Sequence, residues 1–160
     1  LVGFFTLAIT ICSPLLMIPS IVGTTFFKKF ATVSKIDNRI IYITIAMSVF
    51  SYLVFYWMIE PVVHIFYPSG FNEVIGYSRI IALGSILHGF GDLYNRFLYA
   101  KGSGKLIRNG AMIVGGFNIL GYFILINYYG INGALITKTI SGGLYFLFMY
   151  VGYKKYLKVN

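Results

Sequence analysis

Acidic, cysteine and histidine side chains are scarce in this sequence. Asp and Glu together occur 4 times among 160 residues, His occurs twice and Cys once, as Cys12 inside an apolar run. No intrachain disulfide is possible with one cysteine, and so few ligating side chains exclude a closed zinc site. No nucleophile elbow or phosphate-binding glycine loop is present either. We therefore expect no metal, no cofactor and no enzymatic activity.

Charge of either sign is also rare, whereas apolar residues are abundant. Hydrophobic residues make up 58% of the chain, charged residues 11%, and the mean hydropathy is +0.81. Soluble domains have about 45–50% apolar and about 25% charged residues, so this chain must be solvated largely by lipid. Its apolar runs last about 18–25 residues and do not alternate with polar residues, which favours membrane-spanning helices over barrel strands.

The hydrophobic runs predict an all-α membrane protein, a bundle of about five transmembrane helices. The approximate spans are 1–27, 40–59, 74–100, 109–127 and 132–153. The chain begins with an apolar run that lacks a methionine, a basic segment and a cleavage site of the signal-peptide type. We therefore expect it to be a fragment of a longer protein.

The net charge of +9 comes mainly from basic residues between the spans and in the tail. These residues are Lys28, Lys29, Lys35, Arg39, Lys101, Lys105, Arg108, Lys154, Lys155 and Lys158. The connections 60–73 and 128–131 contain no lysine or arginine. The positive-inside rule then predicts an N-terminus outside and a C-terminus in the cytoplasm, and we expect no nucleic-acid partner.

Two prolines, Pro14 and Pro19, lie within the first span. A proline inside a helix removes a backbone donor and clashes with the preceding turn, so a kink or a break is expected. A broken helix is typical of transporter sites, and a kinked packing helix is the alternative.

His88, Asp92 and Arg96 are the most informative polar residues of the chain. Their spacing of four residues places them on one face of the third span, and Ser85 extends that face. Ser85 and Gly89 also form a small-xxx-small pair for helix packing. Intramembrane charge usually faces a cavity, which makes this stripe a candidate for a substrate or proton path. The alternatives are an internal Asp92–Arg96 salt bridge and a neutral, hydrogen-bonded His88.

Lys138 is the charged residue of the fifth span. It lies roughly 9 Å from the outer end of the span, so it either lines the cavity or extends outward to the interface. Gly133, Thr137 and Ser141 form a neighbouring stripe that we expect to serve helix packing. Arg79, at the outer end of the third span, points away from Asp92 and is expected to anchor the interface. The intramembrane charge is thus mostly basic, which suits an anionic cargo.

Short motifs between residues 65 and 134 resemble those of a known family. Residues 98–105 (LYAKGSGK) resemble the L-x-A-x-G-x-x-K junction of Wzx-type polysaccharide flippases, members of the MATE-like (MOP) exporter superfamily. Residues 118–119 (NI) and 129–134 (YGINGA) resemble their N-I…Y-G-I-x-G-A signature, and 65–71 (IFYPSGF) their outer-loop turn. Lys138 departs from the pattern, because the family usually has a small or hydroxyl residue there.

The resemblance implies the C-terminal lobe of a bundle of about 12 to 14 helices that works by alternating access. It implies transport of undecaprenyl-pyrophosphate-linked oligosaccharide repeats, of the O-antigen or capsule kind, across the bacterial cytoplasmic membrane. The implied partners are the lipid-linked oligosaccharide, membrane lipid, a polysaccharide polymerase and a chain-length regulator. Two alternatives stay open: a MATE-like cation or drug antiporter, and a membrane assembly subunit that transports nothing.

Overall fold

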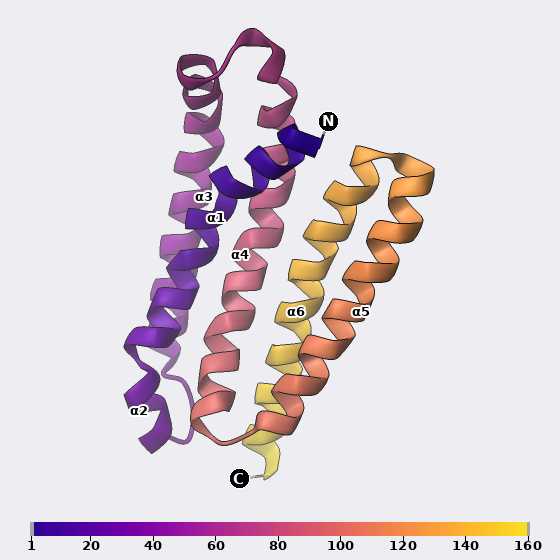
Figure 1. Cartoon of the computed structure of the whole chain (residues 1–160). Coiled ribbons are helices and arrows are strands. Elements are labelled where there is room, and N and C mark those ends of the chain that lie inside the picture. Colours follow the sequence, from indigo (N-terminus) through magenta and orange to yellow (C-terminus); the bar gives the residue numbers. More distant parts are fainter. Residues whose placement is uncertain (1, 160) are drawn as a thin grey trace.

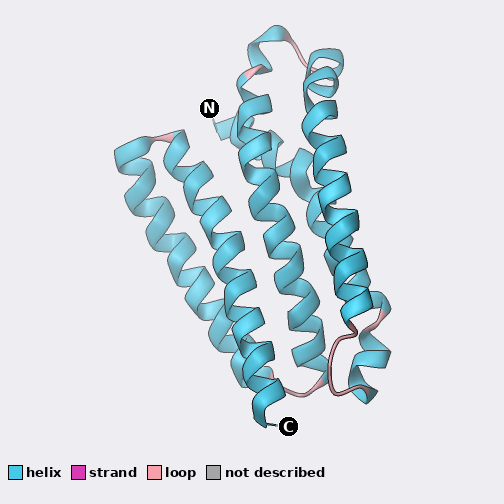
Figure 2. Ribbon diagram, turned by 180° about the vertical axis from the view of Figure 1, so that it is seen from behind, coloured by secondary structure: helices cyan, strands magenta, loops and turns pink. Residues whose placement is uncertain are grey.

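The computed structural model describes residues 2–159, and within this range the chain forms helices and no strands (Figures 1 and 2). The elements are α1 (Val2–Thr25), α2 (Phe27–Thr32), α3 (Asn38–Phe66), the 3-10 turn η1 (Ser69–Phe71), α4 (Glu73–Ala100), α5 (Gly104–Tyr129) and α6 (Ile131–Val159). Among the described residues, 5 segments are long and apolar enough to cross a membrane: α1, α3, η1 together with α4, α5, and α6. The predicted all-α membrane bundle is confirmed.

Several helices extend beyond the spans that hydropathy indicated. α3 continues through Glu60 and Pro61 to Phe66, where the sequence predicted a loop. Its 29 residues correspond to about 44 Å, more than the hydrocarbon core of about 30 Å. Hydropathy marks the apolar core of the bilayer, whereas a helix can continue into the headgroup region, where charged side chains are solvated.

α1 keeps its helical structure through both prolines. Pro14 and Pro19 lie inside the helix, which bends but does not break (Figure 1). Pro19 is buried against α4: a Cβ added to Gly89 of α4 would lie 3.1 Å from the Pro19 ring. The structure therefore has the kinked packing helix and not the broken one.

α4 is the central helix of the bundle. It packs along α1 on one side and α6 on the other, and α5 packs mainly on α6 (Figure 1). α3 makes fewer contacts and exposes large apolar side chains, among them Phe50 (68% exposed) and Trp57 (77% exposed). Such surfaces are costly in water, and on a membrane helix they face lipid.

Small residues set the spacing of the helices. A Cβ on Gly142 of α6 would overlap the carbonyl oxygen of Gly84 on α4, so the two backbones are in contact at this point. The stripe of Gly133, Thr137 and Ser141 is buried, and Thr137 packs against Gly121 of α5.

One end of the bundle collects the basic segments. Figure 1 shows α2, the α4–α5 connection and the C-terminal end of α6 at this end of the bundle. The N-terminal end of α1 and the α3–α4 and α5–α6 connections lie at the opposite end. Lys101 donates a hydrogen bond to the Ala31 carbonyl (3.0 Å), and the Ile36 backbone N–H donates to the Tyr153 hydroxyl (3.1 Å). The first bond joins α2 to the α4–α5 connection, and the second joins the α2–α3 connection to α6.

Candidate functional site

The polar stripe of α4 lies between the two helices that pack on it. Gly89 and Leu93 of α4 contact α1, whereas Gly84 and Gly91 contact α6. At about 100° per residue, the positions of His88 and Asp92 fall between these two contact lines. They are half-buried, and Arg96, one turn further, is exposed. The stripe is therefore the floor of a groove whose walls are α1 and α6.

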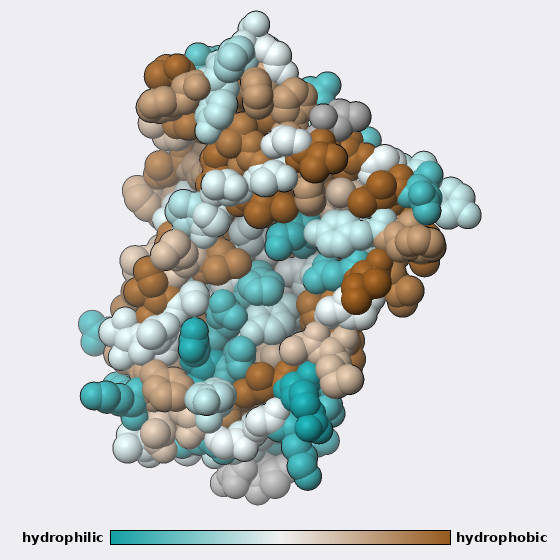
Figure 3. Space-filling view, in the orientation of Figure 1, coloured by the Kyte–Doolittle hydropathy of each residue, from teal (hydrophilic) through white to brown (hydrophobic). Residues whose placement is uncertain are grey.

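Figure 3 shows the same feature on the molecular surface. Hydrophilic side chains gather in a recessed area over α4, between α1 and the α5–α6 pair, and apolar side chains surround much of it. The polar side chains that α4 and α6 contribute at this level are His88, Asp92, Asn95, Arg96 and Lys138. We refer to this region as the polar groove.

Tyr145 of α6 organises the centre of the polar groove. Its hydroxyl donates to Asp92 Oδ1 (3.1 Å) and accepts from Asn95 Nδ2 (2.7 Å). The His88 ring stacks on the Tyr145 ring with centroids 4.4 Å apart and an interplanar angle of 22°. A Cβ on Gly91 would overlap this ring, so glycine is what lets Tyr145 approach α4. The hydrogen bonds hold Asp92 to α6.

The predicted alternative of an Asp92–Arg96 salt bridge is not seen. Among residues 2–158, whose side chains are described, the ion pair that does form is a different one, between Arg79 and Glu60. Asp92 and Lys138 both lie close enough to His88 to interact with it electrostatically. The structure thus brings Lys138 to the α4 stripe from a different helix, while Arg96 remains unpaired toward the basic end.

A line of hydroxyl side chains runs along α1, and the sequence reading missed it. It consists of Thr6, Thr10, Ser13, Ser20 and Thr24, at spacings typical of one helix face. All except Ser20 are exposed, and these four donate to carbonyls of their own helix three or four residues back, which leaves the hydroxyl oxygens as acceptors. The spacing of three, four or seven residues between these Ser and Thr residues is the sequence signal that could have revealed the line.

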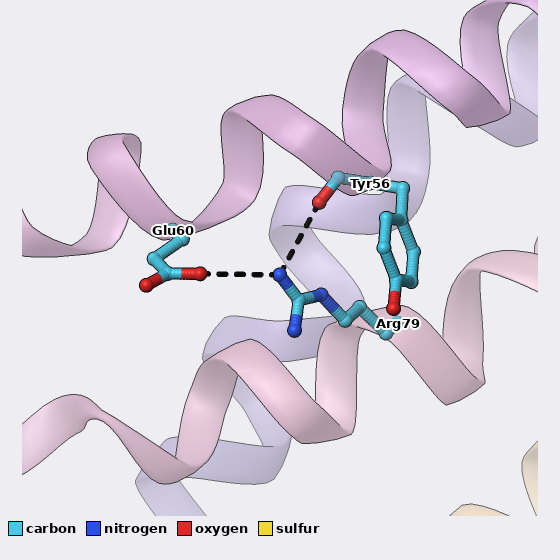
Figure 4. A network of polar contacts seen from close by, with 3 residues as sticks. All are labelled: Tyr56, Glu60 and Arg79. Carbon is cyan, nitrogen blue, oxygen red and sulfur yellow. Dashed lines mark hydrogen bonds and ion pairs between the residues drawn. The ribbon is translucent and has the colours of Figure 1, made fainter.

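Arg79 lies apart from the polar groove, between α3 and α4 (Figure 4). Its Nη2 atom is 3.3 Å from Glu60 Oε2 and 3.4 Å from the Tyr56 carbonyl oxygen. The guanidinium carbon is also 4.4 Å from the centre of the Tyr56 ring. Arg79 therefore joins two helices, and nothing in its contacts points to a ligand.

The described residues contain no group of three or more His, Cys, Asp or Glu side chains placed to hold a metal ion. In the comparisons with known proteins, no family model matches the chain, and no curated protein or solved structure matches it significantly. The likeness of residues 98–105 and 118–134 to flippase motifs stays a prediction from the sequence.

Proposed function

We propose that this chain is the C-terminal lobe of a Wzx-type transporter that moves undecaprenyl-pyrophosphate-linked oligosaccharide repeats across a bacterial cytoplasmic membrane. The protein catalyses no covalent chemistry. It works by alternating access, and the polar groove is the part of the transport path that this lobe contributes. The motifs at 98–105 and 118–134 favour this class of cargo.

The observation that carries the proposal is the charge in the polar groove. An Asp, Lys or Arg at the centre of a membrane helix costs about 2.5–3.5 kcal/mol on insertion scales, and usually faces a bundle interior or a water-filled cavity. Asp92 and Lys138 are half-buried and Arg96 is exposed, on the faces of α4 and α6 that border one groove. A water-filled path next to this groove would keep these groups hydrated.

The composition of the polar groove suits a phosphorylated saccharide. Arg96 and Lys138 outnumber the acid Asp92, whose Oδ1 already accepts a hydrogen bond from Tyr145. Unpaired cations attract a diphosphate, and an arginine fork matches phosphate oxygens in particular. The hydroxyl oxygens along α1 can accept hydrogen bonds from sugar hydroxyls.

Deletion of the gene in the native cell tests the proposal. We expect lipid-linked oligosaccharide to accumulate in membrane extracts while the surface polysaccharide disappears, and the native gene on a plasmid should reverse both effects. Unchanged glycans together with higher sensitivity to cationic drugs would replace the proposal by a cation antiporter with Asp92 as its acidic group. Unchanged glycans together with unchanged drug sensitivity would favour a membrane assembly subunit that transports nothing.

A further inference from the structure

A cationic cavity between α1, α2 and α4 lies at the basic end of the bundle. It has a volume of about 340 Å³ and is lined by Thr24, Phe27, Lys28, Arg96 and Tyr99. α1, α2 and α4 provide this lining, with Lys28 from α2 and Arg96 from α4. We refer to it as the Lys28–Arg96 pocket. Its volume falls within the range of about 300–1,000 Å³ that is typical of small-molecule sites.

The lining combines positive charge with aromatic rings. No acidic residue lines the pocket, and Lys28 and Arg96 take part in no hydrogen bond or ion pair with the other residues whose side chains are described. Asp92, one turn from Arg96, is engaged by Tyr145. The Phe27 and Tyr99 rings lie 5.9 Å apart and supply an apolar wall. An anion with an attached apolar chain would complement both parts.

The depth of the pocket indicates which anion reaches it. Arg96 lies four residues before the last residue of α4, Ala100, which is about 6 Å along the helix axis. Lys28 lies in α2, three residues after the last residue of α1, Thr25. The pocket is therefore at the boundary between the hydrocarbon core and the headgroups, where lipid phosphates are found. Basic pockets between membrane helices at this level bind phosphate headgroups.

We propose that the Lys28–Arg96 pocket binds the phosphate group of a membrane lipid, with its acyl chain along Phe27 and Tyr99. The Arg96 guanidinium offers paired donors to the phosphate oxygens, and Lys28 contributes a second positive charge. The site shares Arg96 with the polar groove but goes beyond the proposed transport function, because it requires only that the bundle spans a bilayer. It holds whether or not the protein moves oligosaccharides.

Lipid binding to the purified full chain tests the site. Native mass spectrometry in an uncharged detergent would be recorded with phosphatidylglycerol, with diacylglycerol of the same acyl chains, and with inorganic phosphate. We expect phosphatidylglycerol to bind best, and Lys28→Ala to weaken its binding roughly fivefold, since a lysine at the membrane surface contributes about 1 kcal/mol. The neighbouring Lys29→Ala, outside the pocket, should change it less than twofold.

Three results would overturn the site. Diacylglycerol binding as tightly as phosphatidylglycerol would show that the phosphate is not recognised, and equal binding of inorganic phosphate would show that the lipid chain is not. Equal losses for Lys28→Ala and Lys29→Ala would reduce the effect to general surface charge. Lys28→Arg keeps the charge and should restore binding, which separates a lost contact from a folding defect. If deletion of the gene left glycan export unchanged, the proposed function would fail, but these lipid-binding readouts would be unaffected.

Discussion

At the residue scale, the side chain that holds the polar groove together is a tyrosine. Tyr145 is bonded to Asp92 and Asn95 and stacked on His88, so one ring of α6 connects three polar positions of α4. A half-buried carboxylate in a membrane protein destabilises the fold unless hydrogen-bond donors reach it, and the Tyr145 hydroxyl donates to Asp92.

Tyr145→Phe removes the hydroxyl and keeps the ring that packs against Gly91 and His88. We expect the free energy of unfolding in detergent to fall by about 1–3 kcal/mol, because Asp92 and Asn95 both lose a partner in a partly buried site. Tyr150→Phe is the control, since the Tyr150 ring packs on Tyr94 while its hydroxyl makes no hydrogen bond to the described residues, and it should cost less than about 0.5 kcal/mol. Equal losses for both variants would contradict the bridging role of Tyr145.

Lys138→Ala tests the charge of the polar groove. If Lys138 contacts the cargo, the variant should accumulate lipid-linked oligosaccharide in the native cell while reaching the membrane in normal amounts, and Lys138→Arg should restore export in part. Arg108→Ala, which removes an exposed positive charge from the basic end outside the flippase-like motif, should export normally. Normal export by Lys138→Ala would mean that Lys138 only extends toward the interface, the alternative that its position in the sequence left open.

At the element scale, glycines decide how closely α4 approaches α6. Gly142 lies directly against the Gly84 backbone, and a backbone contact cannot be relieved by a change of rotamer. The next residue, Gly143, would place a Cβ in ordinary contact, 3.7 Å from Leu87 Cδ1. Two adjacent glycines therefore have different roles.

Gly142→Ala should push α4 and α6 apart and lower the free energy of unfolding by about 1–3 kcal/mol. Gly143→Ala should be neutral or stabilising by up to about 1 kcal/mol, because alanine is the better helix former and the site has room. Unfolding of both purified variants in the same detergent provides the measurement. A Gly142→Ala variant as stable as Gly143→Ala would rule out the close backbone contact.

The elements and the contacts between them differ in how well the sequence predicted them. The apolar runs located every long helix, because hydrophobic length is a local property, and the spacing of His88, Asp92 and Arg96 placed them correctly on one face. The pairing of Asp92 with Tyr145 depends on how α4 meets α6, and that is determined by glycine contacts between residues far apart in the chain. The sequence predicted a loop at 60–73, so the ion pair of Glu60 with Arg79 was also missed.

At the scale of the whole molecule, most basic residues lie at one end of the bundle, and hydrogen bonds connect the segments that carry them. Lys101 bonds to the Ala31 carbonyl, and Tyr153 bonds to the Ile36 backbone, so the basic segments are part of one packed unit. Positive charge on one side of a membrane protein sets its orientation during insertion. The bundle should therefore insert with this end in the cytoplasm.

Cysteine labelling in intact cells tests this orientation. The background variant would be Cys12→Ser, whose hydroxyl can replace the thiol that donates to the Ser78 carbonyl. Ser69→Cys, on the connection between α3 and α4, should react with a membrane-impermeant maleimide in intact cells, whereas Lys105→Cys should react only after the cells are permeabilised. Both positions are exposed in the structure, so burial cannot explain a difference between them. Labelling of Lys105→Cys in intact cells would place the basic end outside. The polar groove would then face the opposite way, and the proposed export from the cytoplasm would have to be reconsidered.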